Sequence, residues 1–266
     1  MSDVHDHNRR AWDERVQQGD WYTGPATDRQ FKNPLAVIDQ CGWLGDVAGQ
    51  RVLCLAAGGG KQAVLYAAAG AIVTVVDISP KMLELDRQMA AERKLKVETV
   101  ATSMDDLSMF EDERFQTVVQ PVSTCYVPDI ELVYRQVARV MVPGGLYISQ
   151  HKQPVNLQAD VLPSARGYLL NEPYYRAGPL PPVAAGTANR ESGTLEFLHR
   201  WEQMLGGLCR SGFLIEDVAE PRHADSKAEP GTFGHRSCFV PPYIKIKARR
   251  KVESAVETSR RKIWMP

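Results

Sequence analysis

The sequence has no hydrophobic run long enough to cross a membrane. Its longest apolar stretch without a charged residue is Gln62–Val76, which is shorter than the roughly 18–20 residues that a spanning helix needs. The stretch Met1–Arg15 is polar and carries several carboxylates, so it does not have the pattern of a signal peptide. We therefore expect a cytoplasmic protein with no membrane partner.

Cysteine is also scarce. The chain has five cysteines, an odd number, and no Cys-x-x-Cys pair, which argues against a disulfide framework and against a zinc ribbon. His5 and His7 flank Asp6, but a chain end seldom builds a metal site, so no metal is expected. A chain of 266 residues with 44% apolar residues is long enough to bury a core without such cross-links.

Neither sign of charge is in excess, because Lys and Arg number 32 and Asp and Glu also number 32. The distribution is uneven, however, since basic residues gather between Lys245 and Lys262. This predicts a basic C-terminal tail over residues 249–266 on a slightly acidic body. Such a tail can bind nucleic acid or a membrane surface, but a solvated chain end is the simpler interpretation.

Strand-like and helix-like segments alternate between Gln50 and Gln150. The β-branched run Ala71–Val76 is typical of a strand buried on both faces. Ser79 followed by Pro80 predicts an N-cap and the first position of a helix. This alternation predicts an α/β fold with parallel strands and right-handed crossovers.

The pattern changes after residue 150. Residues 153–193 begin with a proline-rich stretch that has no clear period, and we expect an inserted substrate lid there. Thr194–Ser211 predicts a helix, and Arg236–Val240 with Tyr243–Ala248 predicts a last strand interrupted by two prolines. We expect a single domain over residues 1–266, with residues 1–49 as a helical cap.

The most informative motif is a strand that runs into a turn of small residues at Ala56–Gly60. Small residues let a ligand approach the backbone closely, and glycine allows positive φ. The next strand ends at Asp77, where a carboxylate can accept hydrogen bonds from both ribose hydroxyls of an adenosyl group. Gly58, Gly60 and Ala63 also fit the loose dinucleotide pattern, so the turn alone leaves the cofactor open.

Taken together, five ordered motifs resemble those of the class I S-adenosylmethionine-dependent methyltransferases, in particular a bacterial small-molecule type. The matching segments are Val52–Gly60, Asp77, Thr102–Leu107, Phe115–Asp129 and Met141–Gly145. The motifs depart from the usual family pattern at four positions. The usual acid is replaced by Cys54 and the usual glycine by Ala56, and two usual Asp residues are replaced by Ser103 and Gln116.

The resemblance implies a Rossmann-like three-layer sandwich around a seven-stranded, mostly parallel sheet with an antiparallel last strand. It implies S-adenosyl-L-methionine as cofactor and S-adenosyl-L-homocysteine as product. The residues that it assigns to cofactor binding are Ala56, Ala57, Gly58, Gly60, Asp77, Ile78, Ser103, Met104, Asp105 and Gln120.

Methyl transfer is an in-line displacement, so the protein must mainly align the reacting atoms in a dry site. Trp12 and Trp21 near the N-terminus and the lid are candidates for covering that site. Tyr126 and His151 are candidate catalytic residues, although packing of Tyr126 and solvation of His151 remain open. Candidate substrate-binding residues are Tyr22, Tyr174, Tyr175, His235 and Arg236.

We therefore expect methyl transfer to a small-molecule acceptor by a monomer or homodimer. One alternative is an NAD-dependent oxidoreductase, but the only Tyr-x-x-x-Lys pattern joins Tyr243 to Lys247 in the expected last strand. A second alternative is an RNA-associated adenosyl-binding protein that uses the basic tail. The acidic body and Val240, in place of the Asn or Asp that precedes Pro-Pro-Tyr in DNA-adenine methyltransferases, argue against DNA as partner.

Overall fold

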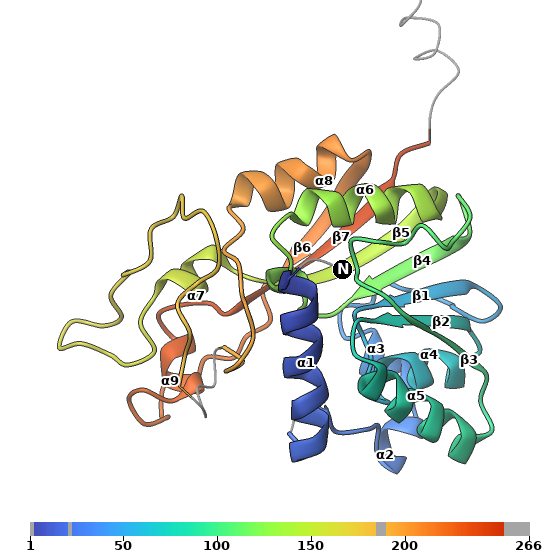
Figure 1. The fold of residues 1–266 in the computed structure, drawn as a ribbon, viewed down its shortest axis with the longest axis horizontal. Helices are drawn as coiled ribbons and strands as arrows, with labels where there is room; N and C mark the ends of the chain where they lie inside the picture. The colour runs from blue at the N-terminus through green and yellow to red at the C-terminus, as the bar shows by residue number, and fades with distance from the viewer. Residues whose placement is uncertain (1–2, 21–22, 185–189, 253–266) are drawn as a thin grey trace, which may run out of the picture.

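One seven-stranded sheet organises the computed structural model, which describes residues 3–20, 23–184 and 190–252 (Figure 1). The strand order is β3-β2-β1-β4-β5-β7-β6. The first five strands in this order pair in parallel, and β7 is antiparallel to both of its neighbours. The strands are β1 (Arg51–Leu55), β2 (Ile72–Asp77), β3 (Val97–Ala101), β4 (Phe115–Gln120), β5 (Met141–Lys152), β6 (Phe213–Ala219) and β7 (Tyr243–Arg250). The predicted mostly parallel sheet with an antiparallel last strand is confirmed.

Helices cover both faces of this sheet. On one side α6 (Ile130–Val140) and α8 (Gly207–Arg210) lie over a hydrophobic cluster that includes Tyr134 and Tyr147. On the other side α4 (Gln62–Ala68) and α5 (Pro80–Arg93) bury a second cluster that includes Tyr66 and Val75. The central strands are rich in β-branched residues because both of their faces are buried. The result is the expected three-layer α/β sandwich.

Helix caps fix where the chain leaves the carboxyl edge of the sheet. The Ser79 hydroxyl accepts a hydrogen bond from the Met82 N–H at 3.1 Å, and Pro80 occupies the first turn of α5. The Asp129 carboxylate accepts from Glu131 N and Leu132 N at the start of α6. The start of α5 was predicted from Ser79 and Pro80.

The N-terminal part lies across the carboxyl edge. Helix α1 (Asp3–Gln18) stands in front of the strand ends, and α2 (Asp28–Phe31) and α3 (Pro34–Ile38) follow beside α4 (Figure 1). Within the described residues, no helix combines the length and the apolar character that a bilayer crossing requires.

The predicted inserted segment starts at α7 (Pro154–Gln158) and then runs without a regular helix to residue 184. In Figure 1 it forms the yellow excursion on the side of the molecule away from β1–β3. The chain returns to the sheet through residues 190–196, which we call the return segment.

Two predicted elements are wrong in their extent. The helix expected over Thr194–Ser211 comprises only a π-helical turn, η3 (Glu202–Gly206), and α8, after a first helical residue at 201. The reason is that backbone groups of the preceding residues bond elsewhere: Phe197 N–H donates to Cys125 O at 2.7 Å, and Glu196 O accepts from Leu180 N–H at 2.7 Å.

The expected interrupted last strand is also wrong in its first half. Residues 233–237 form helix α9 (Phe233–Ser237). Its N-cap is Thr232, whose hydroxyl accepts a hydrogen bond from His235 N–H at 3.4 Å. The second half is the predicted strand, β7. In addition, β5 extends from Met141 through the Pro-Gly-Gly sequence, with a register shift against β4.

Candidate active site

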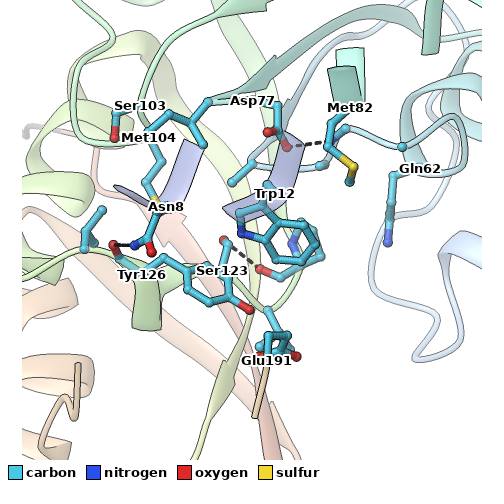
Figure 2. Close-up of a pocket in the computed structure, with 18 of the residues that line it drawn as sticks. Asn8, Trp12, Gln62, Asp77, Met82, Ser103, Met104, Ser123, Tyr126 and Glu191 are labelled. Carbon is cyan, nitrogen blue, oxygen red and sulfur yellow. Dashed lines mark hydrogen bonds between the residues drawn. The ribbon is translucent and has the colours of Figure 1, made fainter. Parts of the chain in front are cut away.

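A pocket of about 340 Å³ lies at the carboxyl edge of β1, β2 and β4 (Figure 2). Its walls come from the glycine turn after β1, the end of β2, the turn after β3 and the exit loop after β4 (residues 121–129). Helix α1 and the return segment complete it. Ligand sites of open α/β sheets lie at this edge, and the volume is in the range of small-molecule sites.

The glycine turn is held by two buried carboxylates. Gly58 N–H donates to Asp77 Oδ2 at 2.9 Å, while Gly59 N–H and Gly60 N–H donate to the two Asp86 oxygens at 3.0 Å. A Cβ on Gly58 would lie 2.8 Å from the Met82 Cβ, and Gly59 has φ 115°. Glycine is therefore required at residue 58 by close approach and at residue 59 by its backbone conformation.

Asp77 lines the pocket and is itself almost fully buried. Its Oδ1 accepts from Ser79 N–H at 2.9 Å. Burial raises the pKa of Asp77 to about 6, although the backbone hydrogen bonds from Ser79 and Gly58 oppose the rise. Burial likewise raises the pKa of Asp86, which sequence reasoning missed, to about 7. A helix-interior Asp carries no signal in the sequence that would mark it as the partner of a distant turn.

Five further residues predicted to bind the cofactor divide into those that line the pocket and those that do not. Ser103, Met104 and Ile78 line the pocket. Asp105 does not: it faces α1, where its Oδ2 lies 3.0 Å from His5 Nε2. Gln120 lies beneath the wall and donates from Nε2 to the Met104 sulfur at 3.2 Å, and it also contacts Ser123 Oγ at 3.0 Å. It therefore supports lining residues instead of facing the pocket.

Helix α1 contributes a wall of the pocket. Asn8 donates from Nδ2 to the Tyr126 carbonyl at 2.9 Å and to the Leu195 carbonyl at 3.1 Å, and its Oδ1 accepts from Leu195 N–H at 2.7 Å. The Trp12 and Tyr126 rings pack edge-on, with their centroids 5.6 Å apart. Both rings line the pocket (Figure 2). Trp12 was expected to cover the site, whereas no pattern in the sequence pointed to Asn8.

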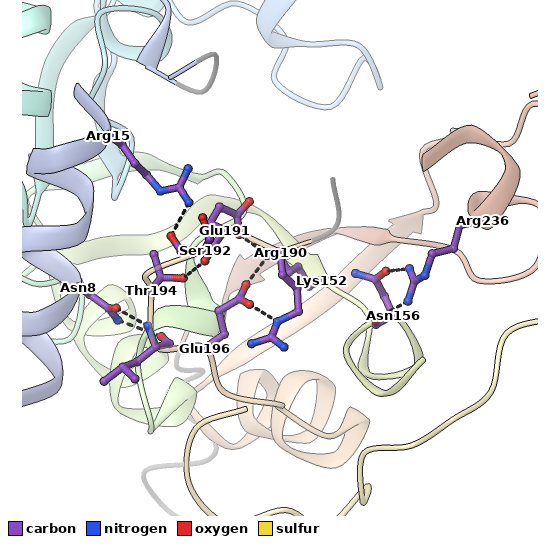
Figure 3. Close-up of polar contacts among 11 residues, drawn as sticks. Asn8, Arg15, Lys152, Asn156, Arg190, Glu191, Ser192, Thr194, Glu196 and Arg236 are labelled. Atoms are coloured by element: carbon purple, nitrogen blue, oxygen red, sulfur yellow. Dashed lines mark hydrogen bonds and ion pairs between the residues drawn. The ribbon is translucent and has the colours of Figure 1, made fainter. Parts of the chain in front are cut away.

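A buried cluster of charges closes the other end (Figure 3). Lys152 Nζ, at the end of β5, lies 2.5 Å from Glu191 Oε2 and also contacts Glu196 Oε1. Arg190 binds the second oxygen of Glu196. Glu191 is the member of this cluster that lines the pocket. The return segment thus places a carboxylate in the site, which the sequence analysis did not anticipate.

The protonation of this cluster follows from its contacts. Burial alone would raise the pKa of Glu191, but the Lys152 ammonium and hydrogen bonds from Lys152 and Tyr126 outweigh burial and lower that pKa. Burial would lower the pKa of Lys152, but the neighbouring Cys125, Glu191 and Glu196 raise it well above its usual value. Glu191 is therefore anionic and Lys152 cationic at neutral pH. Burial raises the pKa of Tyr126 well above its usual value, so its hydroxyl keeps its proton and lies within hydrogen-bonding reach of Glu191.

The geometry does not support His151 as a catalytic residue. Its ring is buried below the pocket wall, with Nδ1 2.8 Å from Thr124 Oγ1 and Nε2 2.7 Å from Ser149 Oγ. Burial lowers the pKa of His151 to about 3, with a further contribution from His199. A neutral imidazole with both nitrogens engaged has no nitrogen to offer a substrate. Tyr126, the other candidate, does line the pocket.

The predicted lid tyrosines lie outside the pocket lining. Tyr174 packs against Leu157, Leu180 and Leu198, and its hydroxyl accepts a hydrogen bond from Trp201 N–H at 3.1 Å. Tyr175 is 79% exposed. The first therefore anchors the excursion, and the second faces outward. Tyr22, also expected at the substrate, lies outside the described residues.

His235 and Arg236 belong to α9 and are likewise remote from the pocket lining. His235 Nδ1 lies 2.8 Å from the Tyr168 hydroxyl. The Arg236 guanidinium is buried and donates to Asn156 and to the carbonyls of Ala159 and Asp160. Because these acceptors occupy its donors, Arg236 holds the end of α7. This structural role replaces the predicted role of Arg236 in substrate binding.

Comparisons with known proteins match this architecture. Residues 53–149 match the model of a methyltransferase domain family. The uncharacterized methyltransferase YbaJ of Bacillus subtilis is 33% identical over 230 residues, which cover 81% of this chain and 90% of that protein. The ubiquinone biosynthesis O-methyltransferase of Xanthomonas oryzae is 32% identical over 127 residues, which cover 47% of this chain and 53% of that protein.

Solved structures share the fold. The S-adenosylmethionine-dependent methyltransferase of Mesorhizobium loti has a TM-score of 0.66 at 23% identity, covering 83% of this chain and 100% of that one. The geranyl diphosphate C-methyltransferase of Streptomyces coelicolor, solved with S-adenosyl-L-homocysteine, has a TM-score of 0.62 at 16% identity, covering 94% and 98%.

The site fits the cofactor that this fold binds. Asp77 presents a carboxylate at the end of β2, and Gly58 leaves no room for a side chain between the turn and α5. The family model, the extended match to the Bacillus subtilis protein and this donor pocket agree. The chain therefore belongs to the class I S-adenosylmethionine-dependent methyltransferases, and S-adenosylmethionine is its cofactor.

Proposed function

We propose that the protein transfers a methyl group to a small-molecule acceptor by in-line displacement. The observation that carries this proposal is the single pocket that runs from Asp77 to Glu191 beneath α1. Its volume of about 340 Å³ lies in the range of small-molecule sites, and α1 forms one of its walls. Two similar proteins, a ubiquinone biosynthesis O-methyltransferase and a geranyl diphosphate C-methyltransferase, are also named for small molecules.

We assign the cofactor to the end of the pocket near Asp77. Asp77 would accept hydrogen bonds from the ribose hydroxyls, and Ser103 and Met104 would border the adenine. The backbone of Ala56–Gly58 would face the methionine part. When bound, S-adenosylmethionine supplies a methyl group on a positively charged sulfur. The chain's own contribution is to orient the reactants and to exclude water.

Two segments would exclude that water. Trp12 and Asn8 bring α1 against the exit loop, and Asn8 also binds the return segment at Leu195. We propose that α1 within the cap of residues 1–49 and the return segment of the lid close the site together. Tyr174 then serves to anchor the lid, and neither Tyr174 nor Tyr175 contacts substrate.

The test is to incubate the full chain with methyl-labelled S-adenosylmethionine and a cell extract separated into small metabolites, protein and nucleic acid. Label in the small-metabolite fraction is the expected result. Label confined to protein or nucleic acid would contradict the proposal. Asp77→Ala serves as the control for enzyme-dependent labelling, because it removes the carboxylate expected to hold the ribose.

A further inference from the structure

The end of the pocket opposite Asp77 has its own carboxylate. Among the described residues that line the pocket, the carboxylates are Asp77 and Glu191, and they lie at opposite ends (Figure 2). The Tyr126 hydroxyl lies within hydrogen-bonding reach of Glu191, and Gln150 and Tyr243 also line the pocket. If the cofactor takes the Asp77 end, the Glu191 end is left for the acceptor.

The surrounding charges keep Glu191 anionic without using up its oxygens. Lys152 binds Oε2 at 2.5 Å, and the Tyr126 hydroxyl and the Glu196 carboxyl group also lie within hydrogen-bonding reach. A carboxylate offers roughly four lone-pair sites, so Glu191 retains capacity for a further donor. Glu196, by contrast, has one oxygen on Lys152 and the other on Arg190, and it does not line the pocket. The cluster thus directs one carboxylate into the site and keeps the other out of it.

We propose that Glu191 binds the hydrogen on the acceptor's nucleophilic atom, so that the acceptor is methylated on a hydroxyl or an amine. This inference rests on the proposed function, because it requires a small acceptor in the pocket. A fixed anion repels an acceptor carboxylate or phosphate at the same place and gives a carbon nucleophile no hydrogen bond. A hydroxyl or an N–H gains a charge-assisted hydrogen bond there.

The step balances as follows. The acceptor oxygen or nitrogen forms a bond to the methyl carbon while the bond between that carbon and sulfur breaks, with its electron pair left on sulfur. For a hydroxyl, the proton of the acceptor oxygen passes to the Glu191 carboxylate and then to water when the product leaves. For an amine, Glu191 orients the N–H, and the methylated nitrogen leaves as an ammonium that gives its extra proton to water. Even a weakly basic carboxylate suffices for a hydroxyl, because an oxygen that gains a methyl group while keeping its hydrogen becomes strongly acidic.

The test uses phenol, aniline and benzoate as probes, because they share one ring and differ in the group that would meet Glu191. Binding to the full chain saturated with S-adenosylhomocysteine is measured by calorimetry, and methylated product is measured by mass spectrometry with S-adenosylmethionine. The variants are Glu191→Gln and Glu196→Gln. Glu172→Gln is the matched control, since Glu172 is also in the lid and paired with an arginine, 2.8 Å from Arg176, but lies outside the pocket lining.

We expect phenol or aniline to bind and be methylated, and benzoate to do neither. Glu191→Gln should weaken probe binding by about 10- to 100-fold, as expected for loss of a hydrogen bond to a charged group, with unchanged affinity for S-adenosylhomocysteine. Unchanged cofactor affinity shows that the variant is folded. Glu196→Gln and Glu172→Gln should alter probe binding much less.

Three results would overturn the inference: benzoate binding as well as phenol, equal probe binding by wild type and Glu191→Gln, or no binding of phenol or aniline by protein that binds S-adenosylhomocysteine. Failure of the proposed function is a different result, namely label from S-adenosylmethionine found only in macromolecules. A labelled small molecule that Glu191→Gln methylates as fast as wild type would leave the proposed function intact and refute the role of Glu191.

Discussion

The two ends of the pocket are built in different ways. At the Asp77 end, the contacts that hold the glycine turn join residues near one another in the chain: Gly58 and Asp77 are 19 positions apart, and Gly60 and Asp86 are 26 apart. At the Glu191 end, Asn8 meets Leu195 across 187 positions. The glycine turn is therefore held within the consecutive elements β1, α4, β2 and α5, although Asp13 of α1 also accepts a hydrogen bond from the Ser79 hydroxyl at 2.6 Å. The Glu191 end exists only when the N-terminal helix, the exit loop and the return segment have assembled. One consequence is that the two ends should respond separately to mutation.

The largest expected effect comes from removing the cation of the Glu191 end. Lys152→Met leaves Glu191 and Glu196 buried without their shared partner, which should lower the free energy of unfolding by about 3–5 kcal/mol. Chemical denaturation measures this. Lys247→Met, which removes a more exposed lysine 3.2 Å from Glu216, should cost at most about 1 kcal/mol. Equal losses in the two variants would show that the buried cluster does not stabilise this end.

The next effect should be confined to the Asp77 end. Asp77→Asn removes the charged acceptor for ribose hydroxyls and should weaken S-adenosylhomocysteine binding by about 1.5–3 kcal/mol, measured by calorimetry. Asp112→Asn, at an exposed carboxylate paired with Arg139, is the control and should bind normally. If Glu191→Gln weakened cofactor binding as much as Asp77→Asn, the division of the pocket into two ends would be wrong.

Asn8 tests the long-range assembly. Asn8→Ala removes three hydrogen bonds to Tyr126 and Leu195 and should lower stability by about 1–3 kcal/mol. Hydrogen exchange should quicken at the Leu195 amide while the amides of Gly58 and Gly60 stay protected. Faster exchange at all of these amides would mean that the two ends unfold as one unit.

The Asp77 end should also depend on pH. Because burial raises the pKa of Asp77 to about 6, above the unfolded value of about 3.9, this carboxyl stabilises the ligand-free fold most below about pH 4. That contribution is lost as pH rises through 6. Cofactor binding should show the opposite trend, since ribose hydroxyls need an ionised acceptor.

We therefore expect S-adenosylhomocysteine affinity to fall by up to about tenfold between pH 6 and pH 5, measured by calorimetry over that range. Asp77→Asn should remove the part of this dependence that is due to Asp77. A wild-type affinity that is flat over this range would contradict the assigned contact.

The smallest effect is expected at the tip of the excursion. Tyr175 is 79% exposed and lies over the Arg200 guanidinium at 5.3 Å. Tyr175→Ala should change stability by no more than about 0.5 kcal/mol and leave cofactor affinity and turnover unchanged. Loss of turnover would instead support the predicted role of Tyr175 in substrate binding.

The same division explains what could be predicted from the sequence. The glycine turn and Asp77 were identified because their spacing reflects a local unit that many α/β proteins repeat. The cofactor-binding role of Ser103 and Met104 was predicted from the order of the five motifs along the chain. Asp86 was missed even at this end, since its partners are backbone N–H groups, which leave no mark in side-chain patterns.

At the Glu191 end, sequence reasoning placed Tyr126 at the pocket but failed for other residues. Glu191 and Asn8 were missed because their roles depend on contacts between distant segments. His151 lies within β5, where the pleat turns its ring into the core beside Thr124 and Ser149. Arg236 was placed in a strand, whereas α9 directs its guanidinium to the end of α7.

The bonds of Asn8 bear on the timing of catalysis. Because Asn8 ties one helix to both the exit loop and the return segment, uncovering the pocket requires these bonds to break together. Both products leave a chamber that has this helix as a wall, so we expect the demethylated cofactor and the methylated acceptor to share one departure event. In that case the opening of α1 limits the turnover rate, and a faster methyl-transfer step alone would not raise that rate.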